Sequence, residues 1–322
     1  MDDKIIQVTT SPFGACNPHP RQVIEESELL VRYNPYGRRL KPEEVGDLVM
    51  DCHGIIAGTE PYTREIIERC SNLEVIARVG VGLDNIDFQA CLENNVAVTY
   101  TPVAPADGVA DLAVGQIINL LRGIYTSNSS VRNGFWKRIM GKLISEVKIG
   151  VLGVGRIGKR VITRLSGFGA DIYACDLAAD LKFGKKYKIK WLNKQELFAT
   201  CDLVTIHIPM SKDNHHCVSY EEMSMMKPGA FLINTSRGPI VDEASLISLL
   251  QNKHLGGVAL DVFEKEPYEG KLTEFENVIF TAHIGSSTNH SRYKMELGAA
   301  SDCLKVLLGQ KPDNMVTEGT IG

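Results

Sequence analysis

Short apolar runs alternate with amphipathic stretches along the first hundred residues of the chain. The runs at residues 4–9, 29–34, 54–58, 74–80 and 96–100 are rich in β-branched residues and predict strands. Helical patterns fill residues 42–52, 63–70 and 85–95, and the first of these begins with a proline and two glutamates. Because strands alternate with helices, we expect a parallel sheet covered on both faces.

The next segment changes character. Residues 104–124 are rich in small apolar residues and predict a long buried helix. Residues 126–140 are polar but carry one large aromatic residue, Trp136. We interpret this segment as an arm that packs against another surface, such as a second subunit.

A second series of apolar runs begins at residue 147. Residues 147–155, 170–176, 187–192, 201–209, 229–236, 256–262 and 277–285 predict further strands with helices between most of them. The final helical stretch, residues 291–310, is too short to form a domain. We therefore expect it to fold back onto the first half, which makes that domain discontinuous.

Composition narrows the class of protein. The chain has 322 residues, 44% of them hydrophobic, and a net charge of −4, which suits two globular domains and disfavours nucleic acid as a partner. The acidic first residues do not resemble a signal peptide, and no apolar run is long enough to cross a membrane. The eight cysteines form no CxxC pair, which favours a cytoplasmic location.

A glycine-rich loop follows the first strand of the second series. Gly153, Gly155 and Gly158 have the G-x-G-x-x-G spacing between a strand and a helical pattern. In a dinucleotide-binding loop these glycines allow a tight turn, close approach to a pyrophosphate and packing of the helix on the strand. A structural turn between strand and helix is the alternative.

An acidic residue ends the next predicted strand, as a dinucleotide-binding fold requires. Asp176 lies about 20 residues beyond the loop, where a carboxylate binds the ribose hydroxyls and repels a 2′-phosphate. No arginine follows it directly. The sequence therefore predicts NAD as the cofactor, in preference to NADP.

Polar residues follow four later strands, where ligands of open α/β sheets bind. They are His207 and Pro209, then Asn234, Thr235, Ser236 and Arg237, then Asp261 and Glu266, and finally His283. His207 fits a structural role as well as a functional one. An arginine, a glutamate and a histidine are thus expected at one edge of the sheet.

These three residue types suit the reduction of a 2-oxo acid. A guanidinium can bind a carboxylate and polarise the adjacent carbonyl. Imidazole exchanges protons near neutral pH, and a carboxylate beside it favours the protonated form. We expect hydride transfer to the carbonyl carbon and proton transfer from His283 to the oxygen. Each residue alone would more often be a structural or solvated group, but their joint occurrence favours catalysis.

Other kinds of site have less support. His215, His216 and Cys217 are adjacent, but no second cluster has the spacing of metal ligands, so we predict no metal. The chain has no G-x-S-x-G motif, which disfavours a serine hydrolase.

These motifs resemble those of the D-isomer-specific 2-hydroxyacid dehydrogenases, especially their D-3-phosphoglycerate dehydrogenase-like branch. The similar segments follow the family's order along nearly the whole chain: "ARVGVGLDNID", "TPVAPADGVADLAVG", "GVLGVGRIGKRV", "MKPGAFLINTSRGPIVDEASL", "GGVALDVFEKEP" and "AHIGSST". The resemblance implies an α/β fold of two doubly wound parallel sheets. A Rossmann NAD-binding domain, residues 103–286, is inserted into a discontinuous flavodoxin-like substrate domain, residues 1–102 and 287–322.

The resemblance also implies roles for particular residues. The catalytic set is Arg237, Glu266 and His283. The cofactor set is Gly153, Gly155, Arg156, Ile157, Gly158, Asp176, His207, Ile208, Pro209, Thr235, Ser236, Asp261, His283 and Gly285. The substrate set is Arg78, Val79, Gly80, Val81, Gly82 and Arg237, with the backbone amides of residues 79–82 holding the substrate carboxylate. The family further implies a homodimer through an arm at about residues 104–140, and hinges near residues 102 and 287.

Some features depart from the family pattern. Ala282 stands where the family often has proline, and residues 57–59 lack an arginine. Because the sequence ends at Gly322, we expect no C-terminal regulatory domain of the kind that some phosphoglycerate dehydrogenases carry. Arg78 remains a candidate phosphate contact. Phosphoglycerate, glyoxylate and hydroxypyruvate therefore stay open as substrates. The other hypotheses are an NAD(H)-sensing corepressor-like protein and a dehydrogenase that oxidises formate or phosphite.

Overall fold

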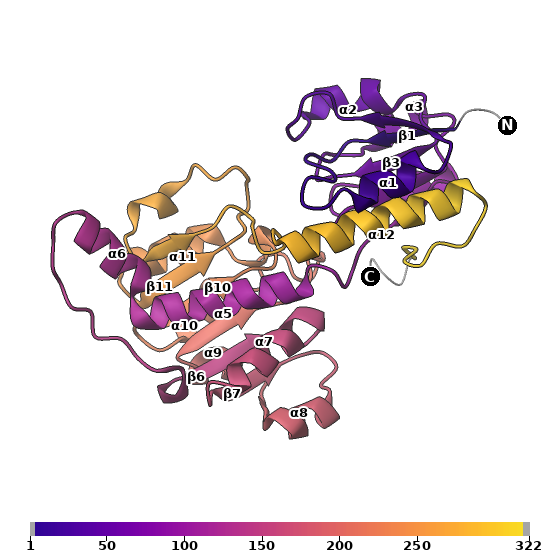
Figure 1. Cartoon of the computed structure of the whole chain (residues 1–322). Coiled ribbons are helices and arrows are strands. Elements are labelled where there is room, and N and C mark those ends of the chain that lie inside the picture. The colour runs from indigo at the N-terminus through magenta and orange to yellow at the C-terminus, as the bar shows by residue number, and fades with distance from the viewer. Residues whose placement is uncertain (1–3, 318–322) are drawn as a thin grey trace. The chain divides into compact units, whose positions relative to one another are not determined.

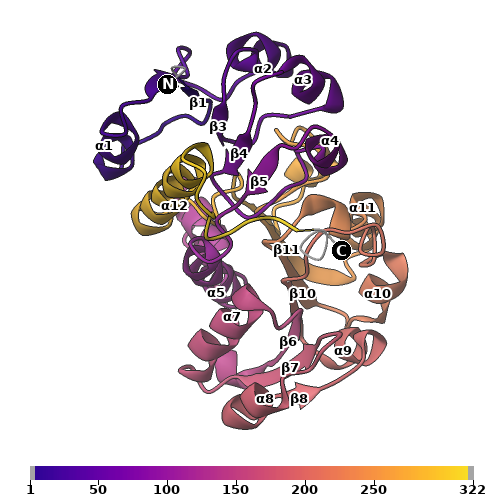
Figure 2. The same cartoon turned by 90° about the vertical axis from the view of Figure 1, so that its right-hand side faces the viewer.

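The chain folds into two compact α/β units. The computed structural model describes residues 4–317; residues 1–3 and 318–322, the ends of the predicted discontinuous domain, lie outside the described part. Unit 1 comprises Met1–Pro105 and Ser287–Gly322, and unit 2 comprises Ala106–Ser286 (Figures 1 and 2). The predicted fold class, a Rossmann unit inserted into a discontinuous unit, is confirmed.

Unit 1 is built on a five-stranded parallel sheet. The strand order is β2-β1-β3-β4-β5, which is the flavodoxin-like order. The strands are β1 (Ile5–Val8), β2 (Leu30–Tyr33), β3 (Gly54–Ala57), β4 (Val75–Arg78) and β5 (Ala97–Thr99). β3 and β4 are buried along their whole length. β3 is apolar throughout and β4 is apolar up to Arg78, as is typical of strands covered on both faces.

Helices cover both faces of this sheet, as Figure 2 shows. α1 (His19–Glu25) and α12 (Asn289–Leu307) pack on the face that carries Ile6 and Ile56. α2 (Pro42–Val49), α3 (Arg64–Arg69) and α4 (Phe88–Glu93) pack on the face that carries Ile55 and Ile76. The final helix therefore returns to the first half of the chain, as predicted, whereas the short helix α1 was not predicted.

Unit 2 is built on a seven-stranded parallel sheet. The order β12-β11-β10-β9-β6-β7-β8 is that of a Rossmann sheet with one further strand. The strands are β6 (Lys148–Leu152), β7 (Asp171–Cys175), β8 (Lys190–Trp191), β9 (Leu203–Ile206), β10 (Ala230–Asn234), β11 (Leu255–Leu260) and β12 (Val278–Phe280). β8 is much shorter than the predicted run at residues 187–192.

Two helical layers enclose the unit 2 sheet (Figure 2). α5 (Ala106–Arg122) and α7 (Arg156–Ser166) share one apolar core with Val151 and Ile233 of the sheet. On the other face, Ile206 and Leu232 pack with α9 (Lys194–Thr200), α10 (Tyr220–Met225) and α11 (Glu243–Gln251). The remaining helices are α6 (Ile124–Arg132), α8 (Leu181–Tyr187), η1 (Ile144–Glu146), η2 (Gly238–Ile240) and η3 (Lys271–Glu274).

The predicted arm has little apolar cover of its own. Its first part forms α6, and Figure 1 shows the following residues as a long loop that returns to β6. Phe135, Trp136 and Met140 are 68%, 85% and 97% exposed. Large apolar side chains with this much exposure are typical of a contact surface, and that role of the arm stays a prediction. No helix within residues 4–317 is both long and apolar enough to span a membrane.

Candidate active site

The carboxyl edge of the unit 2 sheet gathers the loops that carry most of the predicted site residues. β6 pairs with β7 on one side and with β9 on the other, so the direction of winding reverses at β6. At such a point the flanking helices diverge and leave a crevice in which ligands bind. The loops after β6, β9, β10, β11 and β12 all begin at this edge, since every strand pair is parallel.

The glycine loop after β6 requires its small residues for packing and for access. Gly153 has φ +92°, and a Cβ there would lie 2.7 Å from the carbonyl oxygen of His207. A Cβ on Gly158 would lie 2.0 Å from the carbonyl oxygen of Gly153. A Cβ on Gly155, in contrast, would meet nothing within 4 Å. The loop is therefore closely packed on the protein side and open at Gly155, where a pyrophosphate approaches in dinucleotide-binding folds.

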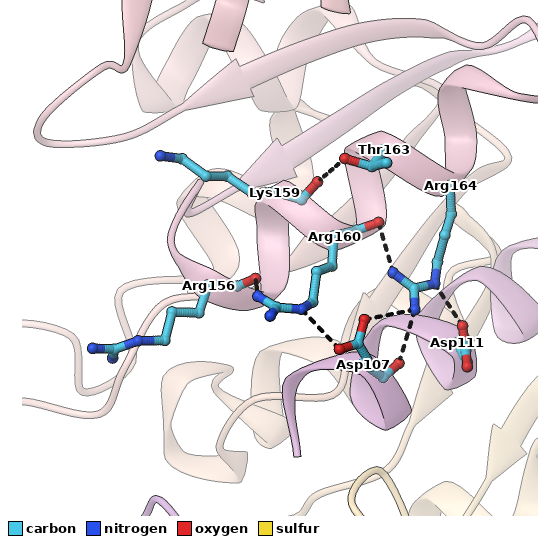
Figure 3. A network of polar contacts seen from close by, with 7 residues as sticks. All are labelled: Asp107, Asp111, Arg156, Lys159, Arg160, Thr163 and Arg164. Carbon is cyan, nitrogen blue, oxygen red and sulfur yellow. Dashed lines mark hydrogen bonds and ion pairs between the residues drawn. The ribbon is translucent and has the colours of Figure 1, made fainter. Parts of the chain in front are cut away.

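Ion pairs with α5 hold the helix that follows this loop. Asp107 accepts a hydrogen bond from Arg164 at 2.9 Å and lies 3.1 Å from Nε of Arg160, and Asp111 accepts from Arg164 at 2.5 Å. Figure 3 shows the guanidinium of Arg156 directed away from this network. The start of α7 is thus fixed in direction, and its free N–H groups and helix dipole favour an anion.

Asp176 lies directly after β7 and is oriented by backbone amides. One carboxylate oxygen accepts the N–H of Val154 in the glycine loop at 2.6 Å, and the other accepts the N–H of Ala178 at 2.8 Å. The carboxylate is therefore held beside the glycine loop. A carboxylate fixed there can still accept hydrogen bonds from ribose hydroxyls through its remaining lone pairs.

Two buried polar atoms at this edge have no hydrogen-bond partner within the described residues. They are Nδ1 of His207 and Oγ1 of Thr235, and the two residues are 8% and 6% exposed. Nε2 of His207 lies 2.9 Å from Oγ1 of Thr205, and burial lowers the pKa of His207 to about 3, so its ring is neutral. Because buried polar atoms are nearly always paired, these two atoms fit a site that a polar ligand completes.

The other predicted cofactor residues of unit 2 lie in the same loops. Ile157 follows Arg156 in the first turn of α7, and Ile208 and Pro209 follow His207 after β9. Ser236 is buried after β10. The N–H of Gly285 donates to Asp261 at 2.8 Å.

Arg237 follows β10 on a turn that Asn234 stabilises. The Asn234 side chain accepts hydrogen bonds from the N–H of Ser236 at 3.0 Å and from its hydroxyl at 2.7 Å. It also donates to the carbonyl oxygen of Arg237 at 2.9 Å. Nη1 of Arg237 in turn donates to the carbonyl oxygen of Ser236 at 2.8 Å. The strand end and its turn thus fix the backbone from which the guanidinium projects.

His283 and Glu266 form a direct pair. Nδ1 of His283 lies 2.9 Å from Oε2 of Glu266, and the N–H of Phe263 donates to Oε1 of Glu266 at 3.2 Å. Partial burial raises the pKa of Glu266, but the hydrogen bond and charge of His283, the Phe263 amide and the charge of Arg237 together lower it below its ordinary value. With Nδ1 engaged by a carboxylate, Nε2 is the nitrogen that can exchange a proton with a ligand.

Asp261 shapes the loop that carries His283. Its carboxylate accepts the Thr281 hydroxyl at 2.6 Å and the N–H groups of Ile284 and Gly285, each at 2.8 Å. The N–H of His283 donates to the carbonyl oxygen of Asp261 at 2.8 Å. His283 has φ +52°, a left-handed conformation that is strained for a side chain of this kind. Asp261 therefore holds a strained residue in place, a role that the sequence did not reveal.

The predicted substrate residues lie in unit 1, at the carboxyl end of β4. The guanidinium of Arg78 is buried and packs against Gly80, where a Cβ would lie 2.8 Å from Nη1. The N–H of Val79 donates to Ala57, and the N–H of Gly80 donates to Thr101 at 2.9 Å. Among the described residues, the N–H groups of Val81 and Gly82 have no hydrogen-bond acceptor. Two of the four predicted amides are thus available to a ligand.

The sequence of most of unit 2 matches a known family model. Residues 114–285 match the NAD-binding domain of the D-isomer-specific 2-hydroxyacid dehydrogenases. This match spans more than half of the chain. The chain belongs to this family. Its members are NAD-dependent oxidoreductases that act on 2-hydroxy acids, and NAD is the cofactor of this dehydrogenase.

Relatives with known names extend the similarity beyond that domain. The dehydrogenase is 32% identical to a glyoxylate reductase from Thermococcus litoralis, over 82% of both chains. It is 33% identical to a D-3-phosphoglycerate dehydrogenase from Methanocaldococcus jannaschii, over 86% of this chain but only 54% of that one. The crystal structure of the TT0316 protein from Thermus thermophilus has a TM-score of 0.88 and 29% identity, covering 97% of this chain and all of that one.

A histidine and two carboxylates lie together beside the proposed site of the dehydrogenase. One ligand atom from each of His216, Asp242 and Glu264 lies within 4.8 Å of the others, which is a possible metal geometry. The same atoms already have hydrogen-bond partners: Asp242 caps α11, and Glu264 accepts from His216 and from the N–H of Glu243. In the sequence His216 stands between His215 and Cys217, whereas in the structure it lies with the carboxylates of Asp242 and Glu264, from two other loops.

Several residues that shape the site of the dehydrogenase carried no signal in the sequence. Gly238, Glu264 and Thr281 act through contacts between segments that are distant in the chain. These segments meet at one edge of the sheet, so strand order had to be known before the contacts could be recognised. Thr205 contacts His207, two residues further along the same segment. Residue type alone is uninformative at such positions, because threonine and glutamate are common in loops.

Proposed function

We propose that this protein interconverts a 2-oxo acid and a D-2-hydroxy acid with NAD(H), using Arg237, Glu266 and His283. The observation that supports this most is the 2.9 Å pair between His283 and Glu266 at the sheet edge that carries the glycine loop. The nicotinamide supplies the hydride when NADH is bound. Nε2 of His283 donates the proton to the carbonyl oxygen, and Glu266 orients the ring and stabilises its charged form.

We propose that the substrate-binding groups are Arg237 and the backbone amides at the carboxyl end of β4. Arg237 binds the carboxylate and polarises the neighbouring carbonyl through its planar guanidinium. The free N–H groups of Val81 and Gly82 bind the carboxylate as well. The cofactor residues are those of the glycine loop and α7, Asp176, His207, Ile208, Pro209, Thr235, Ser236, Asp261 and Gly285, with the unpaired atoms of His207 and Thr235 gaining partners when NAD binds.

The proposed substrate is 3-phosphoglycerate and its oxo acid, with glyoxylate or hydroxypyruvate as the second candidate. The buried guanidinium of Arg78 and the D-3-phosphoglycerate dehydrogenases among the relatives favour a phosphorylated substrate. Gly58 at the end of β3 offers no second cation. The lack of a second cation at this position, and the similarity to a glyoxylate reductase over 82% of that protein's length, favour the smaller acid, glyoxylate.

We further propose that the protein forms a homodimer through residues 104–140. The exposed side chains of Phe135, Trp136 and Met140 support this, because they lose contact with water if a second copy covers them.

The test is a steady-state screen of NADH oxidation with 3-phosphohydroxypyruvate, hydroxypyruvate, glyoxylate, pyruvate and branched 2-oxo acids. The proposal expects turnover with at least one of them, and a D-configured product from each oxo acid whose product is chiral. NADH binding with no turnover, together with a copurifying protein, would favour the corepressor-like alternative. Turnover only with formate or phosphite would replace the substrate class.

A further inference from the structure

Three loops at the carboxyl edge of unit 2 are joined by backbone hydrogen bonds. They are residues 209–219 after β9, residues 235–242 after β10 and residues 261–267 after β11. The N–H of His216 donates to Pro239 at 2.8 Å, and the N–H of Val218 donates to Ile240 at 3.0 Å. These bonds join the first loop to the second, which carries Arg237 near its start.

A reciprocal pair joins the second loop to the third. The N–H of Glu243 donates to Oε1 of Glu264 at 3.1 Å, and the N–H of Glu264 donates to Oε1 of Glu243 at 2.8 Å. Gly238 packs directly on the same turn, since a Cβ there would lie 1.9 Å from the carbonyl carbon of Phe263. The loop of Arg237 and the turn at residues 263–266 therefore cannot move independently.

The side chain of His216 joins the first loop to the third. Its Nε2 lies 2.9 Å from Oε1 of Glu264, the oxygen that also accepts from the start of α11. His216 has φ +51°, where asparagine or glycine would be less strained. A strained backbone at a residue whose ring makes a specific contact points to a role for that ring.

The turn that His216 contacts carries Glu266. The N–H of Phe263, next to Glu264, donates to Oε1 of Glu266, whose other oxygen contacts His283. A shift of the backbone at Glu264 therefore moves one of the two anchors of Glu266. A displacement of about 1 Å in a reacting group lowers the rate by up to about 10²-fold.

We propose that His216 is a positioning residue of the dehydrogenase: its ring holds the turn at residues 263–266 so that Glu266 stays on His283. This inference rests on the proposed function and adds a residue to it. His216 touches neither the proposed substrate residues nor the glycine loop among the described contacts. Its effect is therefore expected in kcat and in the ionisation of Glu266, and not in cofactor binding.

Two variants separate the ring contact from the backbone conformation. In His216→Asn the side chain tolerates the left-handed backbone but is too short to reach Glu264. In His216→Gln the amide extends about as far as Nε2 and can donate to Glu264. Lys212→Ala serves as the control, since Lys212 is an exposed residue of the same loop.

The measurements are kcat, KM for the oxo acid, the Kd of NADH and the pH profile of kcat. We expect His216→Asn to lower kcat by about tenfold, within the range for a misplaced catalytic group. The Kd of NADH stays unchanged, and the acid limb of the profile moves to higher pH. His216→Gln keeps most of the wild-type kcat, and Lys212→Ala behaves as wild type. Equal kcat in wild type and His216→Asn, or equal loss in the Asn and Gln variants, contradicts the proposal.

A second readout does not need turnover. Glu266 faces His283, Arg237 and the Phe263 amide, and a carbon-13 carboxyl signal from it reports its titration directly. If wild type turns over no 2-oxo acid, the proposed function fails, but a higher titration midpoint in His216→Asn still supports the positioning role. An unchanged midpoint overturns it.

Calorimetric titration with Zn²⁺ or Mn²⁺ tests the metal geometry at the same residues. Binding of one ion that is lost in His216→Asn would replace the positioning role by a metal site. No binding, or binding that His216→Asn leaves intact, supports the proposal.

Discussion

The two sheets have parallel strands and helices on both faces, yet their carboxyl edges differ in how polar groups are satisfied. In unit 2, Nδ1 of His207 and Oγ1 of Thr235 are buried without partners within residues 4–317. In unit 1, the buried carboxylate of Glu60 accepts hydrogen bonds from Tyr62 and from the N–H of Gly58, each at 2.7 Å. Oγ1 of Thr99, at the end of β5, also lacks a partner among the described residues. The difference therefore concerns the kind of group: the unit 2 edge leaves a histidine nitrogen and a threonine hydroxyl open, whereas the buried acid of the unit 1 edge is already satisfied.

The loop after β1 is likewise held by contacts within unit 1. Arg292 of α12 donates to the hydroxyl of Thr10 at 3.0 Å and pairs with Glu296 at 2.5 Å. Glu296 is 1% exposed and accepts the N–H of Gly14 at 3.0 Å. A helix nearly three hundred residues later in the chain thus fixes the loop at residues 10–14.

The difference suggests a division of roles. The family model matches residues 114–285, which lie in unit 2, and the proposed cofactor and proton-transfer groups lie there as well. The loop of unit 1 at residues 10–14 is held by contacts with α12. We infer that unit 2 carries the chemistry shared by the family, whereas the loops of unit 1 adapt it to one substrate.

The largest effect is expected at the unit 2 edge. His283→Gln removes the proton donor while keeping a polar side chain, so kcat should fall by about 10²- to 10⁴-fold. Stopped-flow kinetics with saturating oxo acid measure this. The exposed His290→Gln is the matched control and should keep the wild-type rate. A loss of less than tenfold would show that another group delivers the proton.

The pH dependence of this pair comes next in size. The pKa of Glu266 is lowered in the folded protein, so the carboxylate form is present above that lowered pKa and is lost as pH falls through it. Reduction should therefore lose rate below the usual range of a glutamate, and Glu266→Gln should remove this limb and slow the reaction by about 10²-fold. The pH profile of kcat measures both. A variant with an unchanged acid limb would assign that limb elsewhere.

A smaller, selective effect is expected in unit 1. Arg292→Met leaves Glu296 buried without its cation, which should cost about 1–3 kcal/mol in the free energy of unfolding. The loop at residues 10–14 begins at the same sheet edge as the proposed substrate residues 79–82, since β1, β3 and β4 are parallel. When this loop loosens, KM for the oxo acid should rise while the Kd of NADH stays the same. Urea unfolding and fluorescence titration measure the two. Lys294→Met, exposed on the same helix, should change neither. A weaker affinity for NADH would contradict the division of roles.

The smallest effect on activity is expected in the arm. Trp136→Ser removes an exposed indole, so the fold of the monomer is retained but a dimer formed through the arm dissociates. Light scattering after size exclusion measures the mass, and the exposed Lys137→Ser is the control. A wild-type protein that is monomeric at all concentrations would reject the proposed dimer.

Much of the fold could be predicted because its signals are local. Apolar runs such as residues 75–77 in β4 and 149–152 in β6 indicate buried parallel strands, and the glycine spacing indicates the turn before α7. Helix α1 was not predicted because it has only seven residues. Two of them, Pro20 and Ile24, are buried, which is too few to give a recognisable helical period in the sequence. α6 has no buried residue at all, so its sequence resembles a polar loop.

The candidate site was predicted by residue type and strand position, and the geometry between loops was not. Nothing in the sequence indicated that Thr281 and two amides engage Asp261, or that His216 contacts Glu264. These contacts depend on which strands are neighbours and on backbone conformations such as the positive φ of His283 and His216. Such conformations are rare for histidine and are imposed by the surrounding loops.

The most direct test of the central claim follows the hydride itself. NADH carrying deuterium at both C4 positions of the nicotinamide is mixed with the best 2-oxo acid of the screen, and the product is examined by mass spectrometry and chiral chromatography. The account predicts deuterium at C2 of the D-hydroxy acid with wild type, and almost none with His283→Gln under conditions in which that variant still binds NADH. Deuterium-free product, or equal transfer by the variant, would contradict it.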